Sequence, residues 1–302
     1  MTIQPFTPSD LTDLESFDFF SALQLRHHGG LKPENAFSAW EDGTLLGTGF
    51  FVLPTLGNPK GLRKAELTLS IRPDLSPEIA DEARSRLLDA VLAKYRTVRA
   101  AHPETNLILR ICTETSDLAG MAFHLGKGAV LENLIPVLAY NLIQKDEAHP
   151  SMALPDGSRL MTSLPDSIRI EPLPLTDEGF AAYLRAVLEA SDVPDSEAEM
   201  RFRSGNPSFR CFVAIHGKEV VGSASVWDMG EERGATENIF VLPAFRKKGL
   251  ATALIETAWN ELRSRGKKVA TLSVMGTNLP ALALYQRIGY KLVFNLVEIM
   301  YL

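Results

Sequence analysis

The chain has 302 residues, of which 45% are hydrophobic and 23% are charged, and its net charge is -6. This balance is typical of a globular protein with room for two domains, and it argues against intrinsic disorder, collagen and disulfide scaffolds. General binders of nucleic acid or of anionic membranes are normally basic, so the acidic net charge makes both classes poor interpretations.

The sequence indicates a reducing compartment and no metal centre. Its two cysteines, Cys112 and Cys211, lie far apart and form no CxxC pair, which argues against a disulfide framework and a structural zinc site. The adjacent His27 and His28 rarely converge on one metal, and the other histidines are scattered. No secretory signal and no apolar run of about 20 residues is visible. We expect a cytoplasmic protein without a metal, membrane or nucleic-acid partner.

The N-terminal half predicts alternating strands and helices. Two β-rich stretches flank a turn at residues 41–43 and predict a hairpin, and the next strand ends at Pro73. A long amphipathic helix, a strand, a short helix and a last strand complete this half. The predicted ranges, in chain order, are 36–40, 45–53, 64–71, 77–99, 106–112, 118–125 and 129–142.

The C-terminal half predicts the same order of elements more clearly. It follows a Pro-rich stretch, residues 146–166, which we interpret as a linker between domains at 1–145 and 167–302. Its strongest helix starts at Gly249 and stops at Gly266. The predicted ranges are strand 167–172, helix 176–190 with a second helix after it, hairpin strands 209–215 and 219–226, strand 235–241, helix 249–265, strand 269–274, helix 280–288, and one or two strands in 291–302.

The two halves share an order of elements rather than identical residues. In each half a strand ends at a proline, Pro73 or Pro243, shortly before the long helix. We therefore predict a duplicated α/β fold, in which each copy has a central mixed sheet flanked by helices.

Residues 241–252, VLPAFRKKGLAT, join the end of a strand to the start of a helix. The first backbone N–H groups of a helix have no partner within it, so they form an anion site. Gly249 lets an anion approach the backbone, Ala251 keeps that surface small, and residues 246–248 add three cations. Cations in a first helical turn oppose the helix dipole, and a bound phosphate would relieve that cost. Taken alone, such a turn is more often simply solvated.

A second motif makes the pattern specific. Residues 278–290, NLPALALYQRIGY, follow the basic turn after one predicted helix and one strand. The combined pattern, R-x-x-G-x-[GA] and then N-x-x-A-x-x-L-Y-x-x-x-G-[FY], resembles the GNAT superfamily of N-acetyltransferases. The resemblance runs from about residue 168 to the C-terminus and says little about the substrate. The motif residues are Arg246, Gly249, Ala251, Asn278, Ala281, Leu284, Tyr285, Gly289 and Tyr290.

The resemblance implies an acetyl-CoA site. In the family, two parallel strands splay around the pantetheine arm, and here they are residues 235–241 and 269–274. The pantetheine amides would pair with the backbone at 239–241, and the pyrophosphate with the N–H groups of 247–252. Arg287 would reach a CoA phosphate or lie at the surface, and both interpretations stay open. The expected cofactor-binding residues are Ile239, Phe240, Val241, Arg246, Lys247, Lys248, Gly249, Leu250, Ala251, Thr252, Asn278 and Arg287.

The resemblance also implies direct attack of an amine on the thioester. This reaction needs a base for the ammonium proton and an acid for the leaving thiolate. Tyr285 stands where the family usually places the acid, and its phenol has a reference pKa near 10. The alternative is a packing tyrosine whose hydroxyl only hydrogen-bonds the CoA sulfur.

Glu237 is the candidate base. Strand alternation puts it on the same face as Ile239 and Val241, at the side where many family members carry a carboxylate. The alternative is a salt-bridged strand glutamate. Some members carry a glutamate at the position of Ser273, and serine cannot serve as that base, so the base is Glu237 or a chain of water molecules.

The N-terminal copy departs from the pattern. Aligned on the proline, Ser76, Ile79 and Asp81 stand where the C-terminal copy has the motif's Arg, Gly and Ala. Acidic residues at a helix start repel phosphate. Phe123 stands near the equivalent of Tyr285 and has no proton to donate. We predict a degenerate copy without an active CoA site, which walls the acceptor pocket or makes a dimer contact.

The sequence therefore predicts a tandem GNAT protein whose C-terminal domain moves an acetyl group from acetyl-CoA to a primary amine. Tandem members include mycothiol synthase-like enzymes, a likeness of architecture that assigns no substrate. The expected acceptor is a small-molecule amine or a protein N-terminal amine, and a homodimer is one expected assembly. The acidic run at 177–199 is a solvated face or an attractor of a cationic amine. The alternative function is a CoA-binding regulatory or interaction protein that lost turnover.

Overall fold

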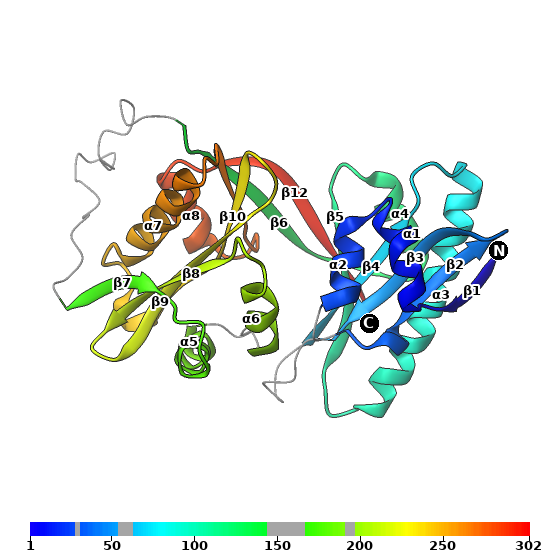
Figure 1. Ribbon diagram of the computed structural model, residues 1–302, viewed down its shortest axis with the longest axis horizontal. Coiled ribbons are helices and arrows are strands. Elements are labelled where there is room, and N and C mark those ends of the chain that lie inside the picture. The colour runs from blue at the N-terminus through cyan, green and yellow to red at the C-terminus, as the bar shows by residue number, and fades with distance from the viewer. Residues whose placement is uncertain (28–30, 54–62, 144–166, 191–196) are drawn as a thin grey trace. The chain divides into compact units, whose positions relative to one another are not determined.

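The computed structural model describes residues 1–27, 31–53, 63–143, 167–190 and 197–302 (Figure 1). The predicted linker lies outside these residues. The chain forms two compact units. Unit 1 consists of Met1–Cys112, Ala122–Leu131 and Ile299–Leu302, and unit 2 consists of Thr113–Met121 and Glu132–Glu298.

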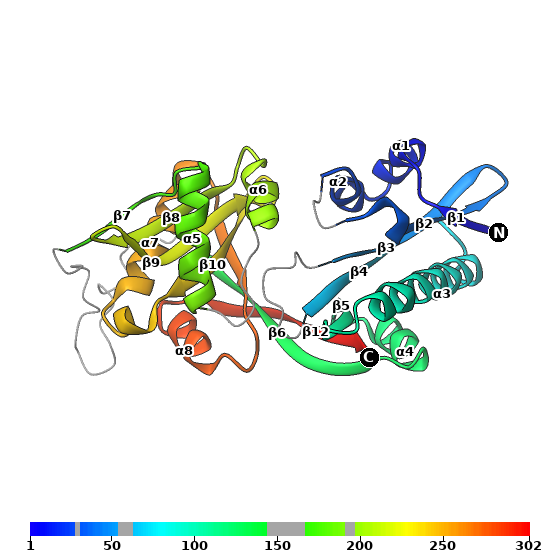
Figure 2. The same ribbon diagram turned by 90° about the horizontal axis from the view of Figure 1, so that it is seen from below.

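Unit 1 is built on a mixed sheet with the strand order β1-β2-β3-β4-β5. Strands β4 and β5 are parallel and the other neighbours are antiparallel. In Figure 2, α1 and α2 lie on one side of this sheet, and α3 and α4 lie on the other. The elements are β1 (Thr2–Pro5), η1 (Pro8–Asp10), α1 (Leu11–Glu15), α2 (Phe19–His27), η2 (Pro33–Asn35), β2 (Ala36–Glu41), β3 (Thr44–Val52), β4 (Arg63–Ile71), α3 (Pro77–Ala101), β5 (Leu107–Glu114) and α4 (Leu118–Gly126).

Unit 2 has the same design, with the strand order β7-β8-β9-β10-β11-β6. Strands β10 and β11 are parallel, and helices α7 and α8 lie on the side of β8 and β9 opposite α5 and α6 (Figure 1). The elements are β6 (Val130–Asn141), β7 (Ile168–Pro172), α5 (Asp177–Ala190), α6 (Glu197–Ser204), β8 (Arg210–His216), β9 (Glu219–Asp228), β10 (Arg233–Val241), η3 (Pro243–Phe245), α7 (Leu250–Ser264), β11 (Val269–Ser273), α8 (Leu279–Arg287) and β12 (Lys291–Tyr301).

Helix α7 is held by the apolar stripe that its sequence predicts. Leu250, Leu254, Ala258 and Leu262 are all buried, at 0–1% exposure. Full burial of one leucine side chain stabilises a fold by about 1.5–3 kcal/mol. Beside this stripe, the Trp259 ring stacks on the ring of Tyr140 in β6, with 3.8 Å between centroids. This packing positions the N-terminus of α7 at the end of β10.

The predicted duplication is visible in the strand register. Gly47 of β3 pairs with Ala39 of β2, and Gly222 of β9 pairs with Ala214 of β8. In both hairpins the register shifts directly after this pair, on the side toward the turn. A Cβ added to either glycine would overlap a backbone carbonyl oxygen of the following strand. The two copies therefore share a close backbone approach at corresponding places, and the predicted mixed α/β fold is confirmed.

The last strands of the copies are exchanged between the units. Strand β6 begins in unit 1 and continues into unit 2, whereas β12 begins in unit 2 and its last residues belong to unit 1. The place beside β11 is filled by β6, with Val269 opposite Asn141 and Ser273 opposite Val137. A single strand therefore follows α8. The division into domains at 1–145 and 167–302 stays a prediction, because the compact units follow this exchange rather than the predicted linker.

Two further observations bear on the predicted class of protein. Cys112 and Cys211 form no disulfide with each other. Within the described ranges, no helix is long and apolar enough to cross a membrane, and no group of three or more His, Cys, Asp or Glu side chains could hold a metal ion.

Candidate active site

Strands β10 and β11 separate shortly after they meet. They pair only from Arg233 opposite Val269 to Ala235 opposite Thr271, although both strands continue. Just past the last pair, the Thr236 hydroxyl donates to the carbonyl of Thr271 over 3.3 Å. Beyond this point no strand in the described ranges pairs with β10 on the β11 side, as the resemblance implies for the pantetheine site.

A buried hydrogen-bond chain closes the base of this separation. The Trp259 indole donates to the Tyr290 hydroxyl over 3.0 Å, and the Tyr290 and Thr236 hydroxyls lie 3.0 Å apart. Since the Thr236 proton goes to a backbone carbonyl, Tyr290 supplies the proton of the second bond. The chain is fully satisfied, so it gives this part of the sheet one rigid arrangement.

Strand β10 carries a bulge that the sequence did not reveal. Glu237 and Phe240 are three positions apart on β10, yet their partners on β9 are only two positions apart. Asn238, inside the bulge, has φ of 50°, a left-handed value. The extra residue reverses the alternation of faces, so Glu237 shares its face with Phe240. The expectation that Glu237 shares a face with Ile239 and Val241 is wrong for this reason.

The shared face of Glu237 and Phe240 is covered by α5. The ring of Phe240 meets the ring of Tyr183 edge-on, with 5.9 Å between centroids. Glu237 is half-buried beside it. A carboxylate at this place could take a proton from an amine that approaches from the α5 side of the sheet, and its catalytic role stays a prediction.

The backbone of the bulge is held by two serine hydroxyls of β9. Ser223 donates to the carbonyl of Asn238 over 2.6 Å, and Ser225 donates to the carbonyl of Glu237 over 3.1 Å. These side-chain bonds replace strand pairing where the register shifts, so the bulge has a defined shape.

Helix α7 starts without a side-chain cap. Its N-cap is Gly249, with φ of 80°, and the first bond to that residue comes from the N–H of Ala253. The N–H groups of the three residues between them have no partner within the helix. The side chains of Leu250 and Thr252 are buried and that of Ala251 is half-buried, so these residues present mainly backbone to an anion.

The three cations of this turn have distinct roles. Arg246 donates from Nε to the carbonyl of Val241 over 2.9 Å, and Lys248 donates to the carbonyl of Ala244 over 2.9 Å. Lys247 has φ of 60°, so the turn contains two left-handed residues with Gly249. All three cations are exposed, and none forms an ion pair with a carboxylate that the structure describes. Their charge is therefore available to an anion.

The corresponding helix of unit 1 is closed to an anion. The Ser76 side chain caps α3 by accepting from the N–H of Ile79 over 3.4 Å. Pro77, the first helical residue, has no N–H. Glu78 stands in the first turn, where bonds from its backbone and from Ser76 lower the pKa of its carboxyl. A negative charge of the protein itself thus occupies this helix start.

This geometry corrects the predicted alignment of the two turns. Ser76 and Gly249 are both N-caps, so they correspond, whereas the sequence had placed Ser76 against Arg246 and Ile79 against Gly249. Asp81 lies in the second turn, where it pairs with an arginine of α3. The error arose because the turn of unit 1 is three residues shorter. The predicted loss of the phosphate pattern agrees with the capped helix.

Tyr285 lies buried on α8 with its ring edge-on to Tyr290, at 5.7 Å between centroids. Burial, with a smaller effect of Tyr290, raises the pKa of the Tyr285 phenol above its usual value. Its hydroxyl forms no hydrogen bond with any residue in the described parts of the chain. The phenol is therefore protonated at neutral pH and has a donor to offer.

The residue of unit 1 that corresponds to Tyr285 is His124, so the expected Phe123 is wrong by one position. In each copy the carbonyl of this residue accepts from the backbone N–H five residues later. His124 is buried, and its Nδ1 lies 2.7 Å from the hydroxyl of Tyr301. The His124 side chain thus has a hydrogen-bond partner within unit 1, whereas the Tyr285 hydroxyl has none among the described residues.

Of the remaining predicted residues, Asn278 has a structural role, and the structure shows no role for Arg287. Asn278 caps α8, and its Oδ1 accepts from the N–H of Ala281 over 3.3 Å. Arg287 is exposed in the last turn of α8 and pairs with no carboxylate within the described ranges. The contacts of Asn278 and Arg287 with CoA stay predictions.

The acidic run of the C-terminal half is partly neutralised. Arg201 of α6 bonds Asp177 over 2.6 Å and Glu197 over 2.7 Å, and its guanidinium lies 5.1 Å from the centroid of Phe180. The described part of this acidic run is therefore a salt-bridged surface, and its ion pairs connect α6 to α5. Such exposed pairs stabilise a fold only slightly.

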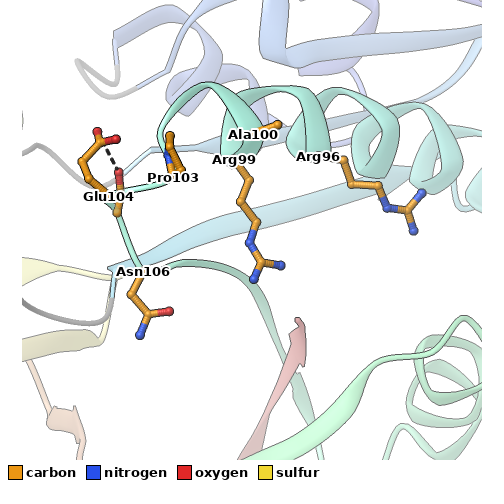
Figure 3. Close-up of a pocket in the computed structure, with 7 residues that line it drawn as sticks. Arg96, Arg99, Ala100, Pro103, Glu104 and Asn106 are labelled. Atoms are coloured by element: carbon orange, nitrogen blue, oxygen red, sulfur yellow. Dashed lines mark hydrogen bonds between the residues drawn. The ribbon is translucent and has the colours of Figure 1, made fainter.

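A surface hollow of about 540 Å³ lies in unit 1, at the C-terminal end of α3. Figure 3 shows Arg96 and Arg99 extending from the helix and Asn106 just before β5. Thr105 donates to Glu104 at its rim. Arginines near a helix C-terminus complement the helix dipole, which accounts for their place. The hollow contains no predicted site residue.

Residues 178–290 match the model of the acetyltransferase (GNAT) family. This segment is a GNAT acetyltransferase domain. The GNAT domain extends from α5 to Tyr290, so it contains every predicted catalytic and cofactor-binding residue. The family match does not include unit 1's capped helix α3.

Comparison with curated proteins gives one similar relative, N-alpha-acetyltransferase MAK3 of Arabidopsis thaliana. It is 33% identical over 84 residues, which cover 26% of this chain and 44% of the relative. The chain thus spans under half the length of this curated relative. The match supports the assignment of the GNAT domain to the acyltransferases.

Solved structures resemble the whole chain and not only the GNAT domain. A GCN5-related N-acetyltransferase from Sphaerobacter thermophilus has a TM-score of 0.63 at 16% identity, covering 99% of this chain and 95% of that one. A tandem GNAT protein from the clavulanic acid biosynthesis pathway has a TM-score of 0.62 at 16% identity, covering 93% and 86%. At such identities the likeness shows the fold, and the tandem arrangement around the GNAT domain is shared.

Proposed function

We propose that the GNAT domain transfers the acetyl group of acetyl-CoA to a primary amine. The observation that carries this proposal is the start of α7, where Gly249 replaces a side-chain cap and leaves three backbone N–H groups for an anion. The same helix start in unit 1 is capped and acidic. Unit 1 forms the same fold with a capped helix. The uncapped start of α7 is therefore a feature that the fold itself does not need.

The residues around α7 fit the pyrophosphate of CoA. Backbone N–H groups of residues 247–252 would hold it, and the exposed cations at 246–248 would add attraction. The edge of β10 at residues 239–241 would pair with the pantetheine amides, because β11 has left that edge. Bound there, acetyl-CoA supplies a thioester as the acetyl donor.

Two side chains of the domain can move the protons of the reaction. Glu237, on the α5 face, would accept a proton from the ammonium form of the amine, directly or through water. Tyr285 would donate to the sulfur as the C–S bond breaks. The raised pKa of Tyr285 keeps its phenol neutral and able to donate a hydrogen bond, and it disfavours complete transfer of the proton. Hydrogen bonding to the thiolate is thus the stronger form of its role.

The proposed acceptor is a small-molecule amine or a protein N-terminal amine. In support of this, the name of the similar curated protein, an N-alpha-acetyltransferase, is a reason to try α-amines first. Glu237 would attract the cationic form of either kind of amine.

Calorimetric titration of the full chain with acetyl-CoA tests the proposal. We expect one site per chain, because only one of the two corresponding helices starts without a cap. Two sites would show that the capped helix of unit 1 also binds, and an absence of binding would overturn the acetyltransferase assignment. A panel of amines and of short peptides with free N-termini then tests transfer. Binding without transfer to any of them would favour a CoA-binding regulatory protein.

A further inference from the structure

The ring of Tyr285 rests against a second tyrosine whose position is fixed by hydrogen bonds. Its neighbour, Tyr290, meets it edge-on at 5.7 Å between centroids. The Tyr290 hydroxyl accepts from the Trp259 indole over 3.0 Å and donates to the Thr236 hydroxyl over 3.0 Å. All three of these side chains are buried. We call Trp259, Tyr290 and Thr236 the Tyr290 network.

The network is held at both of its ends. At one end, the Thr236 hydroxyl passes its proton to the carbonyl of Thr271 on β11. At the other end, the Trp259 ring stacks on Tyr140 of β6 with an angle of 5° between the ring planes. Tyr290 therefore has a defined ring position and a defined hydroxyl direction.

The two adjacent phenols differ in how they are satisfied. The Tyr290 hydroxyl has both a donor and an acceptor as partners. In the described parts of the chain the Tyr285 hydroxyl has no partner, yet its oxygen is not among the fully buried atoms that lack one. The same pair of rings thus contains one phenol that the fold satisfies and one that is left open to a ligand.

Unit 1 shows that the fold does not need the network. The counterparts of its members follow from the caps, the strand registers and the backbone bonds of the two copies. They are Arg86 for Trp259, Ala129 for Tyr290 and Leu67 for Thr236. Leucine and alanine have no polar side-chain group, and the arginine is exposed and donates to Glu82.

The parting of the strands does not explain the network either. In unit 1 the parallel strands β4 and β5 end their pairing at Glu66 opposite Arg110, although both strands continue. By register, this pair corresponds to Ala235 opposite Thr271 in the GNAT domain. Strands part at this place without any such network, so the buried bonds of the GNAT domain need another explanation. The open phenol of Tyr285 lies directly against them.

We propose that Thr236, Tyr290 and Trp259 position Tyr285, so that its hydroxyl points at the thioester sulfur of acetyl-CoA. This inference rests on the proposed function. The electron pair of the breaking C–S bond goes to sulfur, and the resulting thiolate accepts the hydrogen bond of Tyr285. Such a bond weakens steeply when the donor is misdirected, so a fixed ring stabilises the thiolate better than a mobile one. The network residues act through Tyr285 and need no contact with acetyl-CoA.

Thr236→Val tests the network, because valine keeps the shape of threonine and removes the acceptor of the Tyr290 proton. We expect turnover at saturating substrates to fall by about 3- to 10-fold, the effect of one lost hydrogen bond. The affinity for acetyl-CoA, measured by calorimetry, should stay within about 2-fold. Thr236→Ser, which restores the hydroxyl, should restore turnover.

The decisive measurement repeats Thr236→Val in a Tyr285→Phe chain. If the network acts through the Tyr285 hydroxyl, the double variant should turn over like Tyr285→Phe alone. A merely structural effect would lower turnover by the same factor in both backgrounds.

Thr271→Val is the matched control. The Thr271 hydroxyl donates to the carbonyl of Gly234 over 3.2 Å, across the same two strands, and this bond is not part of the network. The variant loses a similar buried bond, so its thermal stability should fall while its turnover stays within about 2-fold.

Unchanged turnover in Thr236→Val, or equal losses with and without the Tyr285 hydroxyl, would overturn the inference and leave the proposed function intact. If the unmodified chain binds no acetyl-CoA, the proposed function itself fails and the inference fails with it. The binding titration therefore separates the two failures.

Discussion

Ser76 and Gly249 are the N-caps of corresponding helices, and they give these helices opposite properties. The Ser76 hydroxyl uses one of the free N–H groups of α3, while Gly249 leaves those of α7 to a ligand. The same chain thus contains two arrangements of the N–H groups at a helix start, one with a side-chain cap and one without. One arrangement pairs a donor within the helix, and the other leaves its donors open to the proposed anion.

The difference between the copies extends beyond the cap. The bulged β10 corresponds to the continuous β4, and the free hydroxyl of Tyr285 corresponds to His124, which is bonded to Tyr301. At each of these three places unit 1 forms an internal hydrogen bond or a regular strand pairing that the GNAT domain lacks. Unit 1 therefore serves as an internal reference for what the fold needs.

Gly249→Ala should weaken acetyl-CoA binding by at least about 10-fold. A side chain at φ of 80° costs about 1–2 kcal/mol, so the turn would shift and the N–H groups would lose their common direction. Calorimetry gives the affinity. Gly266→Ala, at φ of 74° in open space beyond the other end of α7, carries a similar strain. It should lower thermal stability and leave the affinity unchanged. An unchanged affinity for Gly249→Ala would remove the helix start from the site.

Tyr285→Phe should lower turnover by about 10²-fold and leave acetyl-CoA affinity nearly unchanged, because only the hydroxyl is lost. Steady-state kinetics and calorimetry measure the two effects. Tyr290→Phe is the matched control, since this neighbouring hydroxyl bonds Thr236 and Trp259. It should cost about 1–2 kcal/mol of stability and affect turnover less. Equal turnover losses in both variants would assign Tyr285 a packing role.

Tyr290 should make the chain less stable in alkali. Burial raises the pKa of the Tyr290 phenol to about 12, and the hydrogen bond that its oxygen accepts from Trp259 partly offsets this rise. The unfolded chain loses this proton near pH 10 while the folded chain retains it. The contribution is present below about pH 10 and is lost as the pH rises to 12, by roughly 3 kcal/mol. Urea unfolding across this range should show a steeper fall than in Tyr290→Phe. Parallel curves would contradict the shift.

Glu237→Gln should lower turnover at neutral pH by about 10²-fold, with partial recovery at alkaline pH. The recovery is expected because an amine that is already neutral needs no base. The pH profile of kcat/KM measures it. Glu219→Gln, at the hairpin end of β9, is a control that should follow the unmodified profile. A uniform loss at every pH would make Glu237 a binding or structural residue rather than a base.

Removal of residues 299–302 should destabilise unit 1, although these residues lie at the far end of the chain. Ile299, Met300 and Tyr301 are buried there, at 0–5% exposure. Burial of each large side chain is worth about 1.5–3 kcal/mol. Tyr301→Phe, which loses only the bond to His124, should cost about 1 kcal/mol. Hydrogen exchange of α3 amides measures the effect. Unchanged protection after the removal would contradict the assignment of the last residues of β12 to unit 1.

The sequence predicted most elements to within two residues, including β10, α7, β11 and α8. These elements carry local signals, such as the apolar stripe of α7, the proline after β10 and the asparagine that starts α8. The same local signals located the turn before α7 and the helix that carries Tyr285. They could not reveal the bulge at Asn238, because a register shift is a relation between two strands and leaves no periodic pattern in one of them.

By itself the sequence determined the α/β class, the duplication, the motif residues and the loss of the phosphate pattern in the N-terminal copy, because each depends on residues near one another in the chain. Tertiary structure alone decided that Ser76 caps the helix whose counterpart starts at Gly249, that His124 corresponds to Tyr285, and that β6 and β12 change units. The physical reason is that strand partners and registers depend on hydrogen bonds between segments far apart in sequence, which form only when the chain folds. The correspondence of Ser76 with Gly249 and of His124 with Tyr285 rests on local hydrogen bonds, but it becomes visible only when the folded units are compared.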